Sequence, residues 1–226
     1  MQREQLAADP RQIKAIVFDL DGVILESGDI KTQAFLELFS AYPEHRGAIL
    51  KHHLENLGVS RYDKFAWVYR ELLHQPFTDA DRERLGRRFS EMVVEKVLAC
   101  PFVPGARESL EALYGKKLLF VASGTPQGEL DVILTRRRIA PFFEGAWGTP
   151  LKKYQIIERV LEQYDLRRAE VLLIGDGSSD YDAAVRTGIL FVARDTLEQE
   201  MNWSALGIPA IESLEGFELL VQELVV

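Results

Sequence analysis

Four short polar stretches of this sequence contain the residue types that could hold a metal ion and a phosphate group together. Carboxylates that lie close together repel one another unless a cation neutralises them. Oxygen ligands without histidine or cysteine select a hard ion, and Mg²⁺ is the expected one. Lysine and backbone amides could then bind the other oxygens of a phosphate. The stretches are Asp19-Leu20-Asp21-Gly22, Ser123-Gly124-Thr125-Pro126, Gly148-Thr149-Pro150-Leu151-Lys152-Lys153 and Gly175-Asp176-Gly177-Ser178-Ser179-Asp180.

Each stretch has a common structural explanation when taken alone. An Asp-x-Asp-Gly sequence is usually a turn, because Asp and Gly favour turn conformations. Thr125 and Pro126 could be the N-cap and first turn of a helix, and a single lysine is usually a solvated helix residue. Gly175-Asp176-Gly177 also resembles the glycine loop of nucleotide and S-adenosylmethionine binders. That methyltransferase alternative leaves Asp19 and Asp21 without a role, whereas a joint phosphate site uses all four stretches.

Strands and helices alternate in much of the chain, which is typical of a parallel sheet with crossover helices. In such a sheet the ligand site lies beyond the carboxyl ends of the strands, where the polar stretches fall. We therefore predict an α/β fold with a Rossmann-like parallel sheet. The expected strands are 13–18, 117–122, 171–174 and 189–193, and the expected helices between them are 127–138 and 154–164.

A helical insertion separates the first two predicted strands. Residues 27–100 contain no convincing strand, and apolar residues recur at helical spacing in 30–39, 61–73 and 91–98. Two prolines and a glycine just after Cys100 forbid continuation of the last helix. We predict an α/β core domain of residues 1–26 and 101–226, and a helical cap domain of residues 27–100.

Composition narrows the class of protein. The chain has 226 residues, 47% of them hydrophobic, and a net charge of −8, which disfavours nucleic acid and anionic membrane as partners. The single cysteine, Cys100, excludes an internal disulfide and fits a reducing compartment. No apolar run reaches about 18 residues, and Met1–Arg11 lacks a signal-peptide core. These features predict a cytoplasmic globular protein, monomeric or homodimeric.

The four stretches, in this order, resemble the motifs of the haloacid dehalogenase (HAD) superfamily, and more narrowly its phosphoglycolate phosphatase-like members. The resemblance covers nearly the whole chain, and the helical insertion resembles the cap that this superfamily places after its first motif. It implies a Mg²⁺-dependent phosphatase that acts on a small phosphorylated metabolite, phosphoglycolate or a sugar phosphate, through an aspartyl-phosphate. The first motif is Phe18-Asp19-Leu20-Asp21-Gly22-Val23, the second is Ser123-Gly124-Thr125, the third is a lysine near Gly148-Thr149-Pro150, and the fourth is Gly175-Asp176 with Asp180.

The same resemblance assigns roles to individual residues. Asp19 would be the nucleophile and a Mg²⁺ ligand, and Asp21 would be the general acid and base, binding the metal through its backbone carbonyl. Ser123 and the amide of Gly124 would hold phosphoryl oxygens. The remaining roles fall on the third and fourth motifs: Asp176 as a direct metal ligand, Asp180 as a ligand directly or through water, and Lys153, with Lys152 as the alternative, as the motif lysine.

Departures from the family pattern narrow the chemistry. Asp21 argues against dehalogenation, because the dehalogenases of this fold lack the second aspartate. Sugar-phosphate mutases of the family carry a histidine twelve residues after the nucleophile, where this chain has Lys31. A phosphomutase and a non-catalytic scaffold that binds a partner through the cap are the remaining alternatives. Within the cap, Lys31, Arg61 and Lys64 are the candidate substrate contacts, although Arg61 and Lys64 could equally pair with Asp63 at the surface.

Overall fold

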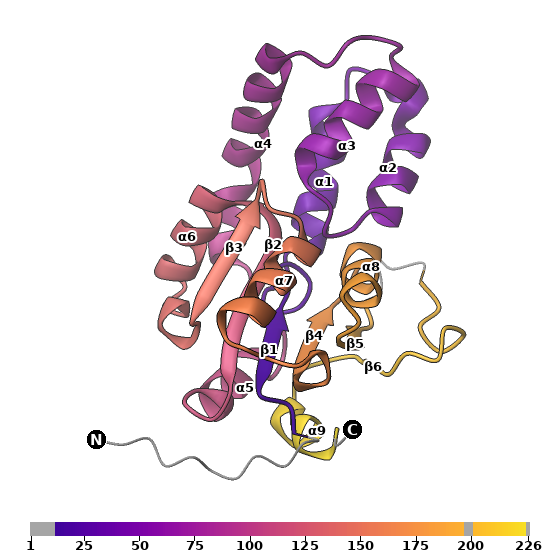
Figure 1. Ribbon diagram of the computed structural model, residues 1–226. Helices are drawn as coiled ribbons and strands as arrows, with labels where there is room; N and C mark the ends of the chain where they lie inside the picture. The colour runs from indigo at the N-terminus through magenta and orange to yellow at the C-terminus, as the bar shows by residue number, and fades with distance from the viewer. Residues whose placement is uncertain (1–11, 197–200, 225–226) are drawn as a thin grey trace.

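The computed structural model describes residues 12–196 and 201–224, and its centre is a parallel β-sheet (Figure 1). The strand order is β3-β2-β1-β4-β5-β6, with every neighbouring pair parallel. The α/β class and the Rossmann-like parallel sheet predicted from the sequence are confirmed. The polar stretch Met1–Arg11 lies outside the described residues. The strands are β1 (Ala15–Phe18), β2 (Leu118–Pro126), β3 (Gly145–Thr149), β4 (Val171–Gly175), β5 (Leu190–Arg194) and β6 (Ala210–Ile211).

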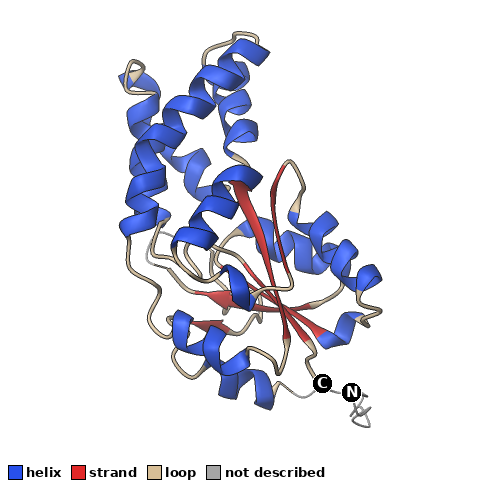
Figure 2. Ribbon diagram, turned by 90° about the vertical axis from the view of Figure 1, so that its left-hand side faces the viewer, coloured by secondary structure: helices blue, strands red, loops and turns tan. Residues whose placement is uncertain are grey.

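Helices cover both faces of the sheet, so the central strands are buried on both sides (Figure 2). Alternate residues of β1 show this directly: Ile16 and Phe18 belong to one hydrophobic core, and Ala15 and Val17 belong to the other. On the first face lie α5 (Ala106–Leu113), α6 (Gln127–Arg136) and α9 (Phe217–Glu223), and on the second lie α7 (Lys153–Gln163) and α8 (Ser178–Thr187).

Residues 27–100, which we call the helical segment, contain helices and no strand, and they lie beyond the carboxyl end of the sheet (Figure 1). The chain enters and leaves this segment through two adjacent stretches, which pair antiparallel at Leu25 and Phe102. The two chain connections between the helical segment and the core therefore lie side by side and form a narrow connection. Its helices are α1 (Gly28–Leu38), α2 (Arg46–Glu55), α3 (Arg61–Trp67), a π-helix (Val68–Leu72) and α4 (Asp79–Ala99).

Several predicted boundaries were wrong. The strand expected to end at residue 122 continues to Pro126, so Thr125 lies in β2 and is not the N-cap of α6. The polar end of β2 hides this continuation, because Pro126 pairs with Thr149 only after an irregularity in register. The pattern also missed β3, whose residues are Gly145–Thr149, because its two glycines and half-buried residues do not look like a strand.

Helix α2 escaped the search for helical periodicity for a related reason. Only Ile49 and His53 of this helix are buried, so it has almost no apolar stripe.

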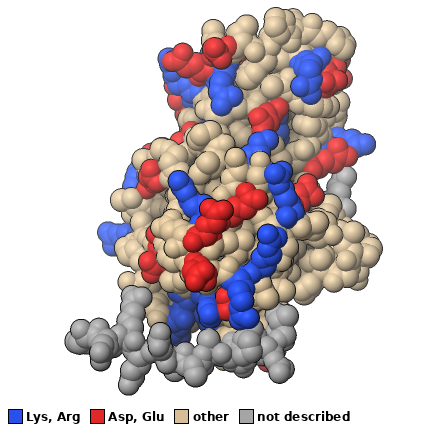
Figure 3. Space-filling view, in the orientation of Figure 1, with Lys and Arg blue, Asp and Glu red and all other residues tan. Residues whose placement is uncertain are grey.

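No helix within residues 12–196 and 201–224 combines the length and apolar character needed to cross a bilayer. On the face drawn in Figure 3, positive and negative side chains are interspersed.

His53 predicts a pH dependence of stability. Burial lowers the pKa of His53 from 6.5 to about 2, and the charges of Lys64 and Lys31 add to the shift. A lowered histidine pKa means that the unfolded chain binds the proton more tightly, so stability is present above 6.5 and is lost as the pH falls below it. We expect the free energy of unfolding to fall by about 2 kcal/mol between pH 7.5 and pH 5 through this residue alone.

Urea denaturation of the wild type and of His53→Gln at both pH values measures that contribution. Other titrating groups cancel in the comparison, so the pH dependence of the variant should be weaker by this amount. Equal pH dependence in the two proteins would contradict the assignment.

Candidate active site

The predicted site residues converge at the carboxyl end of the sheet. Asp19 follows the last residue of β1, Ser123 lies within β2, and Asp176 follows the last residue of β4. Helix starts supply the other two: Lys153 is the first residue of α7, and Asp180 lies in the first turn of α8. The topology places β1 between β2 and β4, so neighbouring strands deliver these side chains to one place.

Lys153 links two of the carboxylates. Its Nζ lies 2.7 Å from Oδ2 of Asp19 and 2.6 Å from Oδ1 of Asp180. All three side chains are at least 95% buried. The other oxygen of Asp19 accepts a hydrogen bond from the amide of Leu20 at 2.6 Å. Lys152, the alternative motif lysine, is exposed at the N-cap of α7. The structure therefore brings Lys153, and not Lys152, into the cluster.

The carboxylates of Asp19, Asp176 and Asp180 form a compact buried group. One oxygen from each lies within 4.8 Å of the others, and one lysine accompanies the three acids. Burial raises the pKa of Asp19 to about 7, with Lys153 opposing the shift and Asp180 and Asp21 adding to it. Burial also raises the pKa values of Asp176 and Asp180. Such a group is short of positive charge, and its all-oxygen donors fit a hard divalent cation such as Mg²⁺.

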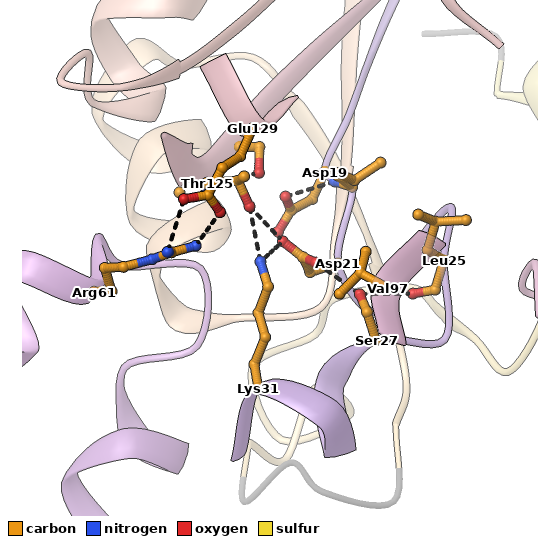
Figure 4. Close-up of polar contacts among 12 residues, drawn as sticks. Asp19, Asp21, Leu25, Ser27, Lys31, Arg61, Val97, Thr125 and Glu129 are labelled. Atoms are coloured by element: carbon orange, nitrogen blue, oxygen red, sulfur yellow. Dashed lines mark hydrogen bonds and ion pairs between the residues drawn. The ribbon is translucent and has the colours of Figure 1, made fainter. Parts of the chain in front are cut away.

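The carboxylate of Asp21 faces Lys31 of the helical segment and Thr125 of β2 (Figure 4). Its carboxylate accepts hydrogen bonds from Ser27 Oγ at 2.6 Å and from Thr125 Oγ1 at 3.1 Å, and it pairs with Lys31. Burial alone would raise the pKa of Asp21, but the charge and hydrogen bond of Lys31, helped by the two hydroxyls, lower it. The two aspartates of the first motif thus have different surroundings, one in a group of acids and the other beside a lysine.

Sequence reasoning missed Ser27 and Thr125 as partners of Asp21. Ser27 ends the connection that leads into α1, and Thr125 lies at the end of β2, so neither is adjacent to Asp21 in sequence. Thr125 was within a recognised motif, which was the only signal that pointed to it. Ser123 is buried in the same strand, and its Oγ accepts a hydrogen bond from the amide of Thr125 at 3.1 Å.

The backbone approaches the cluster closely at two glycines. Gly22 has a φ of +75°, and a Cβ there would lie 2.0 Å from Oδ2 of Asp176. Gly58, in the loop between α2 and α3, also has a φ of +75°, and its Cβ would lie 2.6 Å from Nζ of Lys153. A side chain at either position would collide with an acid or lysine of the cluster. The Gly58 contact also shows that the helical segment reaches the site itself.

The three cations predicted in the helical segment line one small cavity of about 60 Å³, together with Asp21 and Asp176. Arg61 is not a surface partner of Asp63. Its guanidinium makes a two-bond ion pair with Glu129 of α6, at 3.0 and 2.8 Å (Figure 4). Lys31 is paired with Asp21, as described above.

Lys64, also 95% buried, differs from the other two cations. Its Nζ lies 3.4 Å from Nδ1 of His53, and no carboxylate of residues 12–196 and 201–224 pairs with it. Burial lowers the pKa of Lys64 to about 7, and Lys31 adds to the shift.

A second, larger cavity of about 340 Å³ adjoins the cluster on another side. Ser123, Gly124 and Lys153 line its core side, and the loop around Gly58 lines the other. The predicted phosphate-binding residues therefore face a cavity, although Asp19, Asp176 and Asp180 do not line it.

Comparisons with known sequences find similar proteins. A profile of the family described as "Haloacid dehalogenase-like hydrolase" matches residues 16–194. A Thermotoga maritima protein named "Phosphorylated carbohydrates phosphatase" is 27% identical over 188 residues, which is 78% of this chain and 82% of that protein.

Solved structures share the fold. A predicted phosphoglycolate phosphatase from Haemophilus somnus 129pt superposes with a TM-score of 0.72 at 19% identity, covering 94% of this chain and all (100%) of that one. A candidate beta-phosphoglucomutase from Bacteroides vulgatus superposes with a TM-score of 0.76 at 16% identity, covering 96% of this chain and 92% of that one. At these identities the likeness shows the fold alone.

Proposed function

The chain belongs to the haloacid dehalogenase-like hydrolase family, and from this premise we propose that it is a Mg²⁺-dependent hydrolase of a small phosphorylated metabolite. The phosphatase class predicted from the sequence is confirmed. Candidate substrates are phosphoglycolate and sugar phosphates, in line with the names of the relatives. The observation that carries the proposal is the position of Lys153 between Asp19 and Asp180, with Asp176 alongside. The cytoplasmic location expected from composition is part of the proposal.

Asp19 is the proposed nucleophile. Its carboxylate oxygen attacks phosphorus, and the bond from phosphorus to the leaving oxygen breaks, which gives an aspartyl-phosphate and releases the alcohol. Lys153 holds the attacking carboxylate in place through the 2.7 Å contact. Ser123, the amide of Gly124 and Lys153 bind the phosphoryl oxygens.

Asp21 is the proposed general acid and base. It gives its proton to the leaving oxygen, and as a carboxylate it later takes a proton from the water that attacks phosphorus and frees Asp19. The contact with Lys31 keeps Asp21 ionised in the structure described. A leaving group that enters between the two side chains would remove this contact and raise the pKa of Asp21.

Mg²⁺ would be held by the side chains of Asp19, Asp176 and Asp180 and by the backbone carbonyl of Asp21. When bound, it supplies the positive charge that lets a phosphate dianion approach three carboxylates. Phosphate release from a panel of phosphorylated metabolites, with Mg²⁺ and with chelator, tests this assignment. We expect chelator to abolish release and Mg²⁺ to restore it; release unchanged by chelator would contradict the metal assignment.

The helical segment, residues 27–100, is proposed as a cap domain on a core of residues 1–26 and 101–226. The narrow connection at Leu25 and Phe102 supports this division, because it gives a place where the two parts could move relative to each other. Arg61 and Glu129 join the parts across their interface. A cap over the site would exclude water from the attacking step.

Asp21→Asn tests the acid. We expect turnover of an alkyl phosphate to fall about a hundredfold or more, because the alkoxide would leave without a proton. The loss with p-nitrophenyl phosphate should be clearly smaller, because nitrophenolate leaves without help. Equal losses with the two substrates would show that Asp21 does not protonate the leaving group.

A phosphomutase is the second candidate, because a structural neighbour carries that description. It would use the same phosphoenzyme but transfer the group to a second hydroxyl of the sugar. Lys31 at the position of the mutase histidine favours hydrolysis. Scoring the same panel for isomerised product beside free phosphate separates the two activities. A non-catalytic scaffold would give neither, although the proposed nucleophile and acidic cluster are all present.

A further inference from the structure

The small cavity next to Asp21 is where the leaving group must lie. A general acid has to contact the oxygen that it protonates, so the group attached to that oxygen extends into the space beside Asp21. Asp21 lines the cavity of about 60 Å³ and does not line the larger one of about 340 Å³. The larger cavity adjoins the residues that bind the phosphoryl oxygens instead. The walls of the small cavity therefore decide which leaving groups are accepted.

Those walls present one cation without a counter-ion. Arg61 is neutralised by Glu129, and Lys31 by Asp21. Lys64 makes no direct ion pair among the described residues, although it is 95% buried and Asp21 and Asp176 line the same cavity. A buried ammonium group without a directly paired anion is unfavourable, and a ligand that supplies such a negative charge would stabilise it.

Neighbouring side chains hold the amine of Lys64 at the cavity. Its Nζ lies 3.4 Å from Nδ1 of His53, and Nε2 of His53 lies 3.1 Å from Oγ1 of Thr32. The Nζ atom of Lys64 also lies 5.8 Å from the centre of the Phe35 ring. Both His53 and Phe35 line the same cavity as Lys64. A neutral His53 accepts from the ammonium at Nδ1 and donates from Nε2, so one tautomer satisfies both contacts.

The cavity of about 60 Å³ has room for a small polar group such as a carboxylate.

We propose that Lys64 is a specificity-determining residue that binds a carboxylate on the leaving group, so that the substrate is a phosphorylated hydroxy acid. This inference rests on the proposed phosphatase function and chooses among the substrates that the proposal leaves open. The carboxylate would fill the cavity and pair with the ammonium of Lys64, while Asp21 faces the ester oxygen at its other end.

Two substrates that differ only at the critical group test this inference. In 2-phosphoglycolate the leaving group ends in a carboxylate, and in 2-hydroxyethyl phosphate it ends in an alcohol. We expect wild-type kcat/KM to favour the acid by at least about tenfold. Lys64→Met should lower kcat/KM for the acid about 10- to 100-fold. The fold-loss for the alcohol should be smaller than the fold-loss for the acid by a factor of at least about ten. Lys51→Met is the control, because Lys51 is exposed on α2 and pairs with Glu55.

Equal wild-type kcat/KM values for the two substrates would overturn the inference. Equal fold-losses of kcat/KM for the two substrates in Lys64→Met would overturn it as well. The wild-type comparison decides even if the variant does not fold, and stronger product inhibition by glycolate than by ethylene glycol gives a second measure. Turnover of p-nitrophenyl phosphate separates failure of the Lys64 inference from failure of the proposed phosphatase function. Wild-type activity on that ester without a preference for the acid would leave the phosphatase standing and reject the role of Lys64.

Discussion

Asp19→Asn is expected to lower phosphate release at least about a thousandfold, because the proposed mechanism assigns the neighbouring carboxylates of Asp176 and Asp180 to the metal and leaves no second nucleophile. The fold should survive this change. Asp19 is buried beside two further acids, and its pKa is raised to about 7, so the neutral amide removes repulsion as well as a contact with Lys153. Steady-state rates with p-nitrophenyl phosphate, together with thermal unfolding, measure the two effects separately.

The control for Asp19→Asn is Asp79→Asn, which changes an exposed carboxylate in the first turn of α4. Its rate should match that of the wild type. A folded Asp19→Asn protein that retains wild-type turnover would refute Asp19 as the nucleophile.

Lys153→Ala is expected to have the second-largest effect, and it should damage both activity and stability. Its ammonium contacts two buried carboxylates, whose charges raise the pKa of Lys153. Removing one partner of a buried ion pair costs about 3 kcal/mol or more, because the remaining charges are left without compensation. We expect turnover to fall at least about a hundredfold, through lost positioning of Asp19 and weaker binding of phosphate.

Lys152→Ala is the matched control, since it removes an exposed lysine at the adjacent position. Urea denaturation and vanadate inhibition of the two variants compare stability and binding of a phosphate analogue. Mg²⁺ should restore part of the stability of Lys153→Ala, because a cation that binds only the folded cluster shifts the equilibrium toward it. A larger effect of Lys152→Ala would reassign the motif lysine.

The sequence was most informative where a polar residue directly follows a buried apolar strand. Buried apolar runs predicted β1 and β4, and the polar residues directly after them had to lie at one edge of a parallel sheet. That reasoning places Asp19 and Asp176 together, as the structure confirms. Helical periodicity likewise predicted that the long segment between β1 and β2 contains no strand.

Contacts between distant parts of the chain were beyond the reach of patterns. Arg61 and Glu129 are separated by 68 positions, and only the docking of α3 and α4 near α6 brings them together. Sequence reasoning therefore considered Arg61 only as a substrate contact or a surface partner of Asp63. Similarly, His53 follows another histidine on a helix without an apolar stripe, and nothing local showed that it is buried against Lys64.

The most direct test of the central claim is a search for phosphate on the enzyme. Wild type mixed with Mg²⁺ and p-nitrophenyl phosphate is quenched in acid within one turnover, and its peptides are analysed by mass spectrometry. The proposed mechanism predicts one phosphoryl group on the peptide that contains Asp19, absent with chelator and absent in Asp19→Asn. Turnover without any phosphorylated peptide at all quench times, or a phosphoryl group on a different residue, would contradict it.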